Sequence, residues 1–442
     1  MYLMKFFLSK EDITPDRPVF LAGYGDRNRK SEGVLDPIYA QVVLLKSNKT
    51  LLILTFDFLG GDRSFVTGMK NELKRNFGFQ EDDILINFSH THSSIFVTGE
   101  DPDLRRGNYS IDQEKWPETK EDVNFTEDIR YFLFIKNKVV QMVLSGMKQW
   151  IEGTVQLFRG TSNLALNRRL VTAEGTKFAP NYNGEFDNDL LVLQLSDTNH
   201  TKRGILFFYA CHPVCRNSYQ ISSDYVGITR VEIENYFPES IAIFIQGCAA
   251  ELRPRKSACG DIFKKLTEDE IQEIGSGFAN EIVGLLNNDN GVIINGDFRT
   301  KLVDVQLQTT EMSLAEIESI LTDPTKGEAR KRAARRMIRA IREGTEKRSI
   351  QHYIQCWDLD RQTRLIAMEG EVSTEYSLKI KKLFLNKTTI VLGYSNGVST
   401  YIPTAKMALE GGYETEIVLT HDLRGPLTPD VEQTIFEQIV NM

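Results

Sequence analysis

Three of the six histidines of this chain follow closely on apolar, β-branched runs of sequence. His90 and His92 come after the run at 84–88, and His212 comes after the run at 205–209. If these runs are strands of an α/β protein, their carboxyl ends mark the edge where ligands bind. In an extended His-Thr-His sequence both rings point to the same side, because side chains alternate with period two. Imidazole at a rigid strand end is a good zinc ligand, so the pattern indicates a metal site.

Three further apolar runs also end in polar or acidic residues. The run at 365–368 precedes Glu371, the run at 241–245 precedes Glu251, and the run at 389–392 precedes Tyr401. Glycine and asparagine follow strands in most proteins, because turns require them. Turn chemistry does not explain why a strand with a buried character should end in Glu371 or His212. The gathering of histidine, glutamate and tyrosine at several strand ends therefore indicates a functional site.

The elements that must position these residues alternate along the chain. Short, almost continuously apolar runs predict strands at 39–45, 51–58, 84–88, 190–195, 205–209, 241–245, 365–368 and 389–392, typical of a sheet covered on both faces. Helical periodicity predicts helices at 63–77, 127–150, 227–236, 268–286 and 330–342. The predicted fold class is α/β, with a layered mixed β-sheet core flanked by helices and the metal site at strand ends. Polar segments at 98–124 and 171–188 are expected to be irregular, and either could be a lid or decoration.

Composition excludes several classes of function. The 442 residues carry a net charge of -8, which gives no attraction to nucleic acid. No apolar run approaches the roughly 20 residues of a transmembrane helix, and no convincing signal peptide opens the chain. Five cysteines, an odd and sparse set, indicate reduced thiols and a cytoplasmic location. The basic segment at 326–348 predicts an amphipathic helix that docks by its apolar side. The sequence carries no signal of oligomeric state.

The motifs, taken in order, resemble those of the neutral ceramidase family, specifically its N-terminal catalytic domain. The matching segments lie at 12–15, 21–25, 36–40, 57–60, 89–93, 166–168, 212–213, 222–224, 246–254, 370–371, 401–404 and 412–414. Each motif is short, and the specificity lies in their order along the chain. The resemblance implies that residues 1–442 form a single catalytic domain, and that the C-terminal β-sandwich domain of the family is absent.

The resemblance also implies a role for each matching residue. His90, His212, Glu371 and Tyr401 match the zinc ligands of the family. His92 matches a histidine beside the metal, and Arg168 and Tyr413 match polar groups that line the reaction centre. Ser223 matches a serine once regarded as catalytic in that family; no nucleophile elbow surrounds it, which favours a positioning role.

These roles imply a zinc-dependent hydrolase that cleaves the amide bond of a small N-acyl or lipid-like substrate, with ceramide as the substrate named by the family. Two histidines and a carboxylate leave zinc one open position, at which a water acquires a pKa of about 7. His92 is expected to carry the proton to the leaving amine, with Arg168 and Tyr413 donating to the oxyanion.

Departures from the family keep other interpretations open. After Ser93 this chain has Ser-Ile-Phe-Val where the family has a glycine-rich sequence, so the substrate cleft is expected to differ. The alternatives are a zinc hydrolase of a smaller polar amide or ester, and a non-catalytic relative that binds a ligand. Cys211 and Cys215 flank His212 and could form a structural metal site, although core positions are favoured. Asp57 and Asp224 could be metal ligands, although a role in orienting histidine rings is favoured.

Overall fold

The computed structural model describes residues 3–105, 110–112, 124–288 and 290–442. The larger sheet runs in the order β14 (Ile241–Gln246), β12 (Lys202–Tyr209), β11 (Asp189–Asp197), β8 (Ile151–Thr161), β1 (Met4–Asp12), β3 (Tyr39–Lys46), β4 (Thr50–Phe56) and β6 (Ile84–Phe88), with the short β18 (Val292–Ile293) beside β8. The pairs β12/β14 and β4/β6 are parallel and the other pairs are antiparallel. The sheet is therefore mixed, as predicted.

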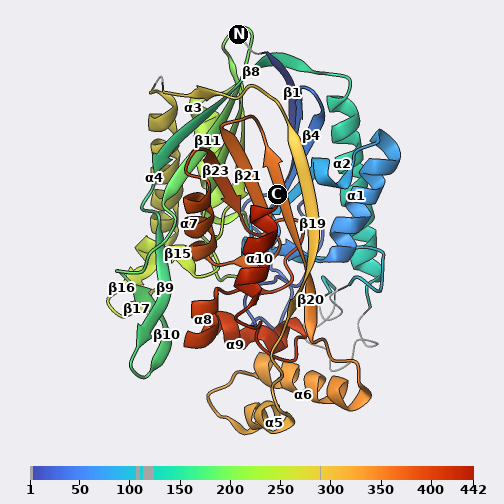
Figure 1. The fold of residues 1–442 in the computed structure, drawn as a ribbon, viewed down its shortest axis with the longest axis vertical. Coiled ribbons are helices and arrows are strands. Elements are labelled where there is room, and N and C mark those ends of the chain that lie inside the picture. The colour runs from blue at the N-terminus through green and yellow to red at the C-terminus, as the bar shows by residue number, and fades with distance from the viewer. Residues whose placement is uncertain (1–2, 106–109, 113–123, 289) are drawn as a thin grey trace.

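A second sheet packs face to face against the larger one (Figure 1). Its order is β19 (Arg299–Gln308), β20 (Ser349–Asp358), β21 (Thr363–Met368) and β23 (Thr388–Leu392), of which β21 and β23 are parallel. Apolar side chains from both sheets share one core, in which Trp357 is fully buried. This burial of two apolar faces against each other explains the continuous apolar character of the central strands.

Helices cover the outer faces of the two sheets (Figure 1). Against the larger sheet lie α1 (Arg63–Phe77), α2 (Thr126–Gly146), α3 (Asp224–Tyr236) and α4 (Glu268–Leu286). Against the smaller sheet lie α7 (Thr374–Leu383) and α10 (Val431–Val440). Local sequence sets the helix ends: Asp62 accepts a hydrogen bond from the Phe65 amide at the start of α1, and a capping box of Thr267 and Glu270 starts α4. The predicted layered α/β class is confirmed.

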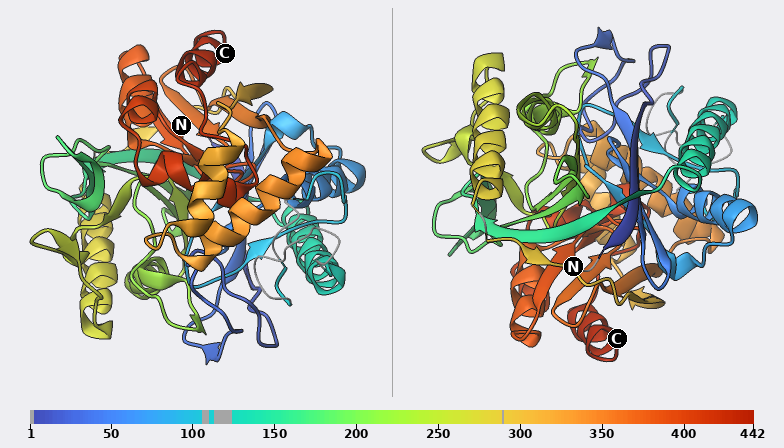
Figure 2. Two further views of the ribbon diagram at one scale, coloured as in Figure 1. Left: turned by 90° about the horizontal axis from the view of Figure 1, so that it is seen from below. Right: turned by 90° about the horizontal axis from the view of Figure 1, so that it is seen from above.

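The predicted basic helix is α6 (Glu328–Glu343), which packs on α5 (Leu314–Thr322). The two helices lie across one end of the sandwich (Figure 2, left). Buried Ala334, Met337 and Ile338 face Ile317 of α5, which confirms docking by the apolar side. The short helices α8 (Ala405–Glu410) and α9 (Tyr413–Glu416) lie near the same end of the molecule (Figure 1).

The prediction that 171–188 is irregular is wrong in its first half. Strand β9 (Ala165–Thr172) turns directly into β10 (Gly175–Asn181), and β15 (Leu252–Pro254) pairs with the other edge of β9. Gly175 makes the tight turn with a φ of 120°. The predicted irregular segment at 98–124 lies partly outside the described residues, and residues 98–105 form no helix or strand.

Short two-residue strands complete the set of described strands. They pair as β2 (Gly33–Val34) with β13 (Gln220–Ile221), β5 (Gly60–Gly61) with β7 (Phe96–Val97), β16 (Ala258–Cys259) with β17 (Ile262–Phe263), and β22 (Glu371–Val372) with β24 (Tyr401–Ile402). In the described part of the chain, no helix is long and apolar enough to cross a membrane.

Candidate metal centre

The site forms where the carboxyl ends of three parallel strand pairs meet. The pair β4/β6 leads to His90, β12/β14 leads to His212, and β21/β23 leads to Glu371. One buried side chain joins the three pairs: the amide nitrogen of Asn87 donates to the carbonyls of Gln246 and Gly393 at 3.2 and 3.0 Å. The backbone amide of Gln246 in turn donates to the side-chain oxygen of Asn87 at 2.9 Å. This connection holds the three strand ends in a common frame.

Backbone carbonyls orient the two buried histidine rings. The Nδ1 atom of His90 lies 2.5 Å from the carbonyl of Leu59, and Nδ1 of His212 lies 2.7 Å from the carbonyl of Ala249. A carbonyl only accepts, so these contacts assign the proton of each neutral ring to Nδ1. The Nε2 lone pair of each ring is therefore directed into the site, which is the tautomer that binds a metal through Nε2.

Glu371 meets both rings with a single oxygen. Its Oε2 lies 3.3 Å from His90 Nε2 and 3.2 Å from His212 Nε2. Gly370 makes this approach possible with a φ of 86°, since a Cβ there would stand 2.6 Å from the Thr400 carbonyl. Two ligands of a tetrahedral zinc ion, each about 2.0–2.2 Å from the metal, are about 3.3–3.5 Å apart. The observed separations fit that spacing.

His90 Nε2, His212 Nε2 and Glu371 Oε2, together called the donor set, also favour a cation for electrostatic reasons. Burial lowers the pKa of His212 to about 4, so its ring is neutral at pH 7. Burial raises the pKa of Glu371, but positive charge on the adjacent rings, when present, lowers it well below its usual range. The Glu371 oxygen faces the Nε2 lone pairs of His90 and His212, and neither Nε2 carries a proton to donate to it. A divalent ion among these three atoms would satisfy all of them, so the residues fit a metal site.

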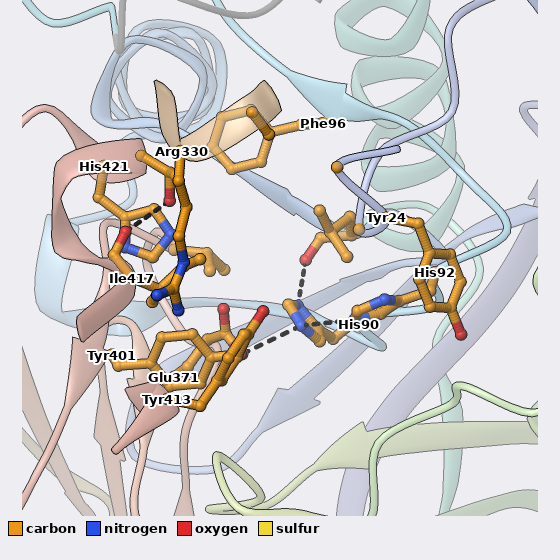
Figure 3. Close-up of a pocket in the computed structure, with 16 residues that line it drawn as sticks. Tyr24, His90, His92, Phe96, Arg330, Glu371, Tyr401, Tyr413, Ile417 and His421 are labelled. Carbon is orange, nitrogen blue, oxygen red and sulfur yellow. Dashed lines mark hydrogen bonds and ion pairs between the residues drawn. The ribbon is translucent and has the colours of Figure 1, made fainter. Parts of the chain in front are cut away.

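His92 lies beside this donor set (Figure 3). Its Nε2 is 3.4 Å from His90 Nε2, and the ring nitrogens of His90, His92 and His212 all lie within 4.8 Å of one another. The sequence predicted that strand alternation brings the two rings together, and this is not how they meet. His90 instead adopts a left-handed φ of 64°, and the chain turns tightly after β6. A non-glycine residue in this conformation is strained, which is typical of functional sites.

A close backbone contact sets the position of the His92 ring. Gly23 has a φ of 95°, and a Cβ on it would lie 2.5 Å from His92 Nδ1. That Nδ1 atom is buried and has no hydrogen-bond partner among the described residues. Burial is the largest effect that lowers the pKa of His92 well below its usual range. His92 is therefore a neutral base whose Nε2 faces the site.

Tyr401 and Tyr413 form a wall next to Glu371. Tyr401 of β24 pairs directly with Glu371 of β22. The Tyr401 ring lies 5.9 Å from the Tyr413 ring. Burial and the Glu371 carboxylate raise the pKa of Tyr401 well above its usual range. Arg168 lies behind this wall: its Nη2 donates to the Tyr401 hydroxyl at 3.2 Å, and its Nε donates to Glu414 at 2.9 Å. The structure thus brings Arg168 to the tyrosines, although it does not line the cavity.

Ser223 lies apart from these residues. Its hydroxyl donates to Asp36 at 2.6 Å, and the neighbouring Ser222 amide donates to the Ser93 carbonyl at 2.9 Å. The Ser222 carbonyl also accepts a hydrogen bond from the Thr91 hydroxyl. Ser223 therefore belongs to a turn that braces the segment carrying His90 and His92, and it does not line the cavity.

A cavity of about 110 Å³ opens onto the donor set (Figure 3). Residues from both ends of the chain line it: Gly23, Tyr24, Gly25, Leu59, His90, His92, Phe96, Ala329, Arg330, Glu371, Val398, Tyr401, Tyr413, Ile417, Thr420 and His421. Of the three apolar residues after Ser94, Phe96 lines the cavity, whereas Ile95 and Val97 lie in the hydrophobic core.

Sequence reasoning missed several residues of this site. The Tyr394 hydroxyl lies 3.5 Å from His212 Nε2, and its ring centroid lies 4.4 Å from that of His90. Tyr394 follows β23, so strand-end position was a usable signal. His421 and Arg330 also line the cavity, but they come from helical segments and carried no such signal.

The expectation that acidic residues orient the histidines is wrong. Asp57 instead forms a buried ion pair with Arg230 at 2.6 Å, and Asp224 accepts backbone hydrogen bonds at the start of α3. Within the described residues, His90 and His212 group with His92 and with Glu371 as side chains that could hold a metal, and no cysteine belongs to this set. Cys211 and Cys215 are buried in the core, as favoured.

No protein-family model matches the chain, and no curated protein sequence matches it. Two solved structures resemble it in fold. The neutral ceramidase from Pseudomonas aeruginosa aligns with a TM-score of 0.72 and 16% identity, over 100% of this chain and 74% of that chain. A structure described as ceramidase complexed with C2 aligns with a TM-score of 0.70 and 15% identity, over 100% of this chain and 75% of that chain. The fold that the sequence resemblance implied is confirmed.

Proposed function

We propose that this chain is a zinc-dependent hydrolase that cleaves the amide bond of a ceramide-like N-acyl substrate. The observation that carries the proposal is the meeting of His90 Nε2, His212 Nε2 and Glu371 Oε2 at separations that suit zinc, beside an open cavity. Tyr401 is the proposed fourth protein ligand. Zinc bound there would supply an acidified water and a Lewis acid for the scissile carbonyl.

The protein residues around the donor set fit the steps of amide hydrolysis. His92 is neutral and its Nε2 faces the donor set, so it can take a proton there and pass it to the leaving amine. Tyr413 offers a hydroxyl group on the opposite wall for a developing oxyanion. Burial lowers the pKa of Arg168, but the nearby Tyr401 and Glu414 outweigh it, so Arg168 stays charged and polarises both tyrosines. Ser223 is proposed to position the histidine segment.

Two further proposals concern the whole chain. Residues 1–442 are proposed to act as one catalytic domain, because the residues that line the cavity extend from Gly23 to His421. A cytoplasmic location is proposed because all five cysteines are unpaired.

A smaller polar amide or ester is the second candidate substrate. The cavity of about 110 Å³ is small beside the roughly 300–1,000 Å³ of typical ligand pockets. A neighbouring cavity of about 580 Å³ shares Arg330, Ile417 and Thr420 with it, and would have to contribute if a long acyl chain binds. A series of N-acyl substrates from two to sixteen carbons separates these candidates.

The first test is metal content together with hydrolysis. The wild type, His212→Ala and Glu371→Ala are loaded with zinc, freed of excess, and analysed for metal, with the exposed His200→Asn as a matched control. We expect about one zinc per chain in the wild type and control, and loss from both site variants, with loss of N-acyl hydrolysis. Wild-type protein without metal would refute the mechanism. Zinc without any hydrolysis would favour a ligand-binding relative.

A further inference from the structure

Arg253 lies next to the tyrosine wall of the site. It belongs to β15 and pairs with Leu166 of β9. Because side chains alternate along a strand, Arg253 and Arg168 project from the same face of this small sheet. The guanidinium carbons of Arg168 and Arg253 lie 5.0 and 5.7 Å from the centre of the same Phe178 ring. Arg253 is thus separated from the wall by a single aromatic residue.

Arg253 does not line the cavity, but its charge reaches a residue that does. Burial raises the pKa of Tyr24, which lines the cavity, to about 12, and the charge of Arg253 is the largest effect opposing that rise. Tyr24 in turn packs edge-on against His92, with ring centroids 5.0 Å apart. The positive charge of Arg253 therefore acts on the same cavity that holds the donor set.

The other arginines of low exposure in the described part of the chain have partners that offset their charge. A carboxylate pairs with each of Arg63, Arg168, Arg169, Arg216, Arg230, Arg336 and Arg364. Arg27 donates to three backbone carbonyls. The Nε atoms of Arg27, Arg63 and Arg216 are also buried without a partner, but these residues bond through their terminal nitrogens. Arg253 differs, because among the described residues its guanidinium has no hydrogen-bond or carboxylate partner at any nitrogen. Burial and the charge of Arg168 lower its pKa.

Two aromatic rings hold the unpaired guanidinium in place. The central carbon of the guanidinium lies 4.9 Å from the centre of the Phe263 ring and 5.7 Å from the centre of the Phe178 ring. Such stacking leaves the edge of the guanidinium for hydrogen bonds. Arg253 is partly exposed, and only its Nε is buried without a partner, so its terminal nitrogens remain open to a ligand.

We infer that Arg253 binds an anionic group of the substrate, so that the preferred substrates are N-acyl compounds bearing a carboxylate, such as N-acyl amino acids. This inference rests on the proposed amide hydrolysis. A carboxylate matches the single positive charge and the planar fork of one arginine, whereas a phosphate monoester carries about two negative charges.

The test compares two substrates with the same acyl chain. N-dodecanoylglycine carries a carboxylate, and N-dodecanoylethanolamine carries a hydroxyl in its place. Arg253→Gln is compared with Arg255→Gln, a matched control whose Nε donates to the Asn163 carbonyl. Hydrolysis is measured as kcat/KM, binding of N-dodecanoylglycine by calorimetry, and folding by thermal melting.

We expect wild type and Arg255→Gln to prefer the glycine substrate. Arg253→Gln is expected to lose about 10- to 100-fold in kcat/KM and affinity for it, with the ethanolamine substrate unchanged within about twofold. Its melting temperature should not fall, because the variant removes an unpaired charge. Equal hydrolysis of both substrates by wild type and Arg253→Gln would overturn the inference and leave the proposed function standing. Calorimetric binding that depends on Arg253, without hydrolysis, would support the anion site and refute the proposed function. A lower melting temperature with unchanged preference would identify a structural arginine and overturn the inference.

Discussion

Replacing Gly23 by alanine tests whether the position of the His92 ring controls activity. The new Cβ would stand 2.5 Å from His92 Nδ1 and 2.6 Å from Cγ, whereas non-bonded contacts to carbon are about 3.5–4.0 Å. The ring must therefore move by about 1 Å, or the backbone must leave its φ of 95°, which costs an L-residue about 1–2 kcal/mol. A displacement of that size at a reacting group lowers the rate about 100-fold.

The assay separates activity from metal binding. Zinc content, kcat for an N-acyl substrate and melting temperature are measured for Gly23→Ala and for Gly33→Ala, where a Cβ meets nothing within 4 Å. We expect Gly23→Ala to keep about one zinc per chain and to lose about 100-fold in kcat, because His90, His212 and Glu371 are untouched. Gly33→Ala should resemble the wild type.

Two results would refute this reasoning. Wild-type kcat in Gly23→Ala would show that the position of His92 does not limit the reaction. Loss of zinc together with activity would show that His92 is itself a ligand, as its membership of the histidine cluster allows.

Three further predictions concern the scaffold. Because the pKa of His212 is about 4 in the folded protein and about 6.5 when unfolded, acid favours the unfolded chain. The His212 ring should contribute a fall of about 3 kcal/mol in stability of the metal-free protein between pH 6.5 and pH 4 in urea titrations. His212→Asn should remove that share and leave the shares of the buried His92 and His352, whose pKa values are also lowered; an unchanged fall would contradict the prediction. Asn87→Ala removes the bonds of Asn87 to the Gln246 carbonyl, the Gly393 carbonyl and the Gln246 backbone amide, and should cost about 3–5 kcal/mol of unfolding free energy, with reduced zinc affinity; unchanged affinity would contradict the role of Asn87 in the frame. Asp57→Ala leaves Arg230 unpaired in the core and should cost about 3–5 kcal/mol in the same assay, whereas a neutral effect would mean that solvent reaches Arg230.

The strands that the sequence predicted are those with both faces buried. All eight predicted strands and five predicted helices are present, some with shifted ends. The strands missed include β1, β8 and β19, in which exposed or half-buried residues interrupt the apolar pattern. An alternating pattern of this kind is weaker than a continuous apolar run, and pairing with neighbouring strands decides it.

The sequence by itself determined the chemistry of the donor set. His90, His212 and Glu371 each follow a buried strand, and ligand residue types at strand ends are visible without a structure. Residues of the cavity that come from irregular or helical segments, such as His421 and Arg330, could not be found this way, because nothing local distinguishes them from surface residues.

Only the tertiary structure decided how these residues act together. The sequence indicated that carboxylates orient the histidines, but backbone carbonyls of Leu59 and Ala249 do so, and any residue type can supply a carbonyl. The unpaired state of Arg253 was equally invisible, because whether a charge has a partner depends on chain segments that are distant in sequence. Residue types set which reactions are available, and the folded backbone sets which atoms face one another.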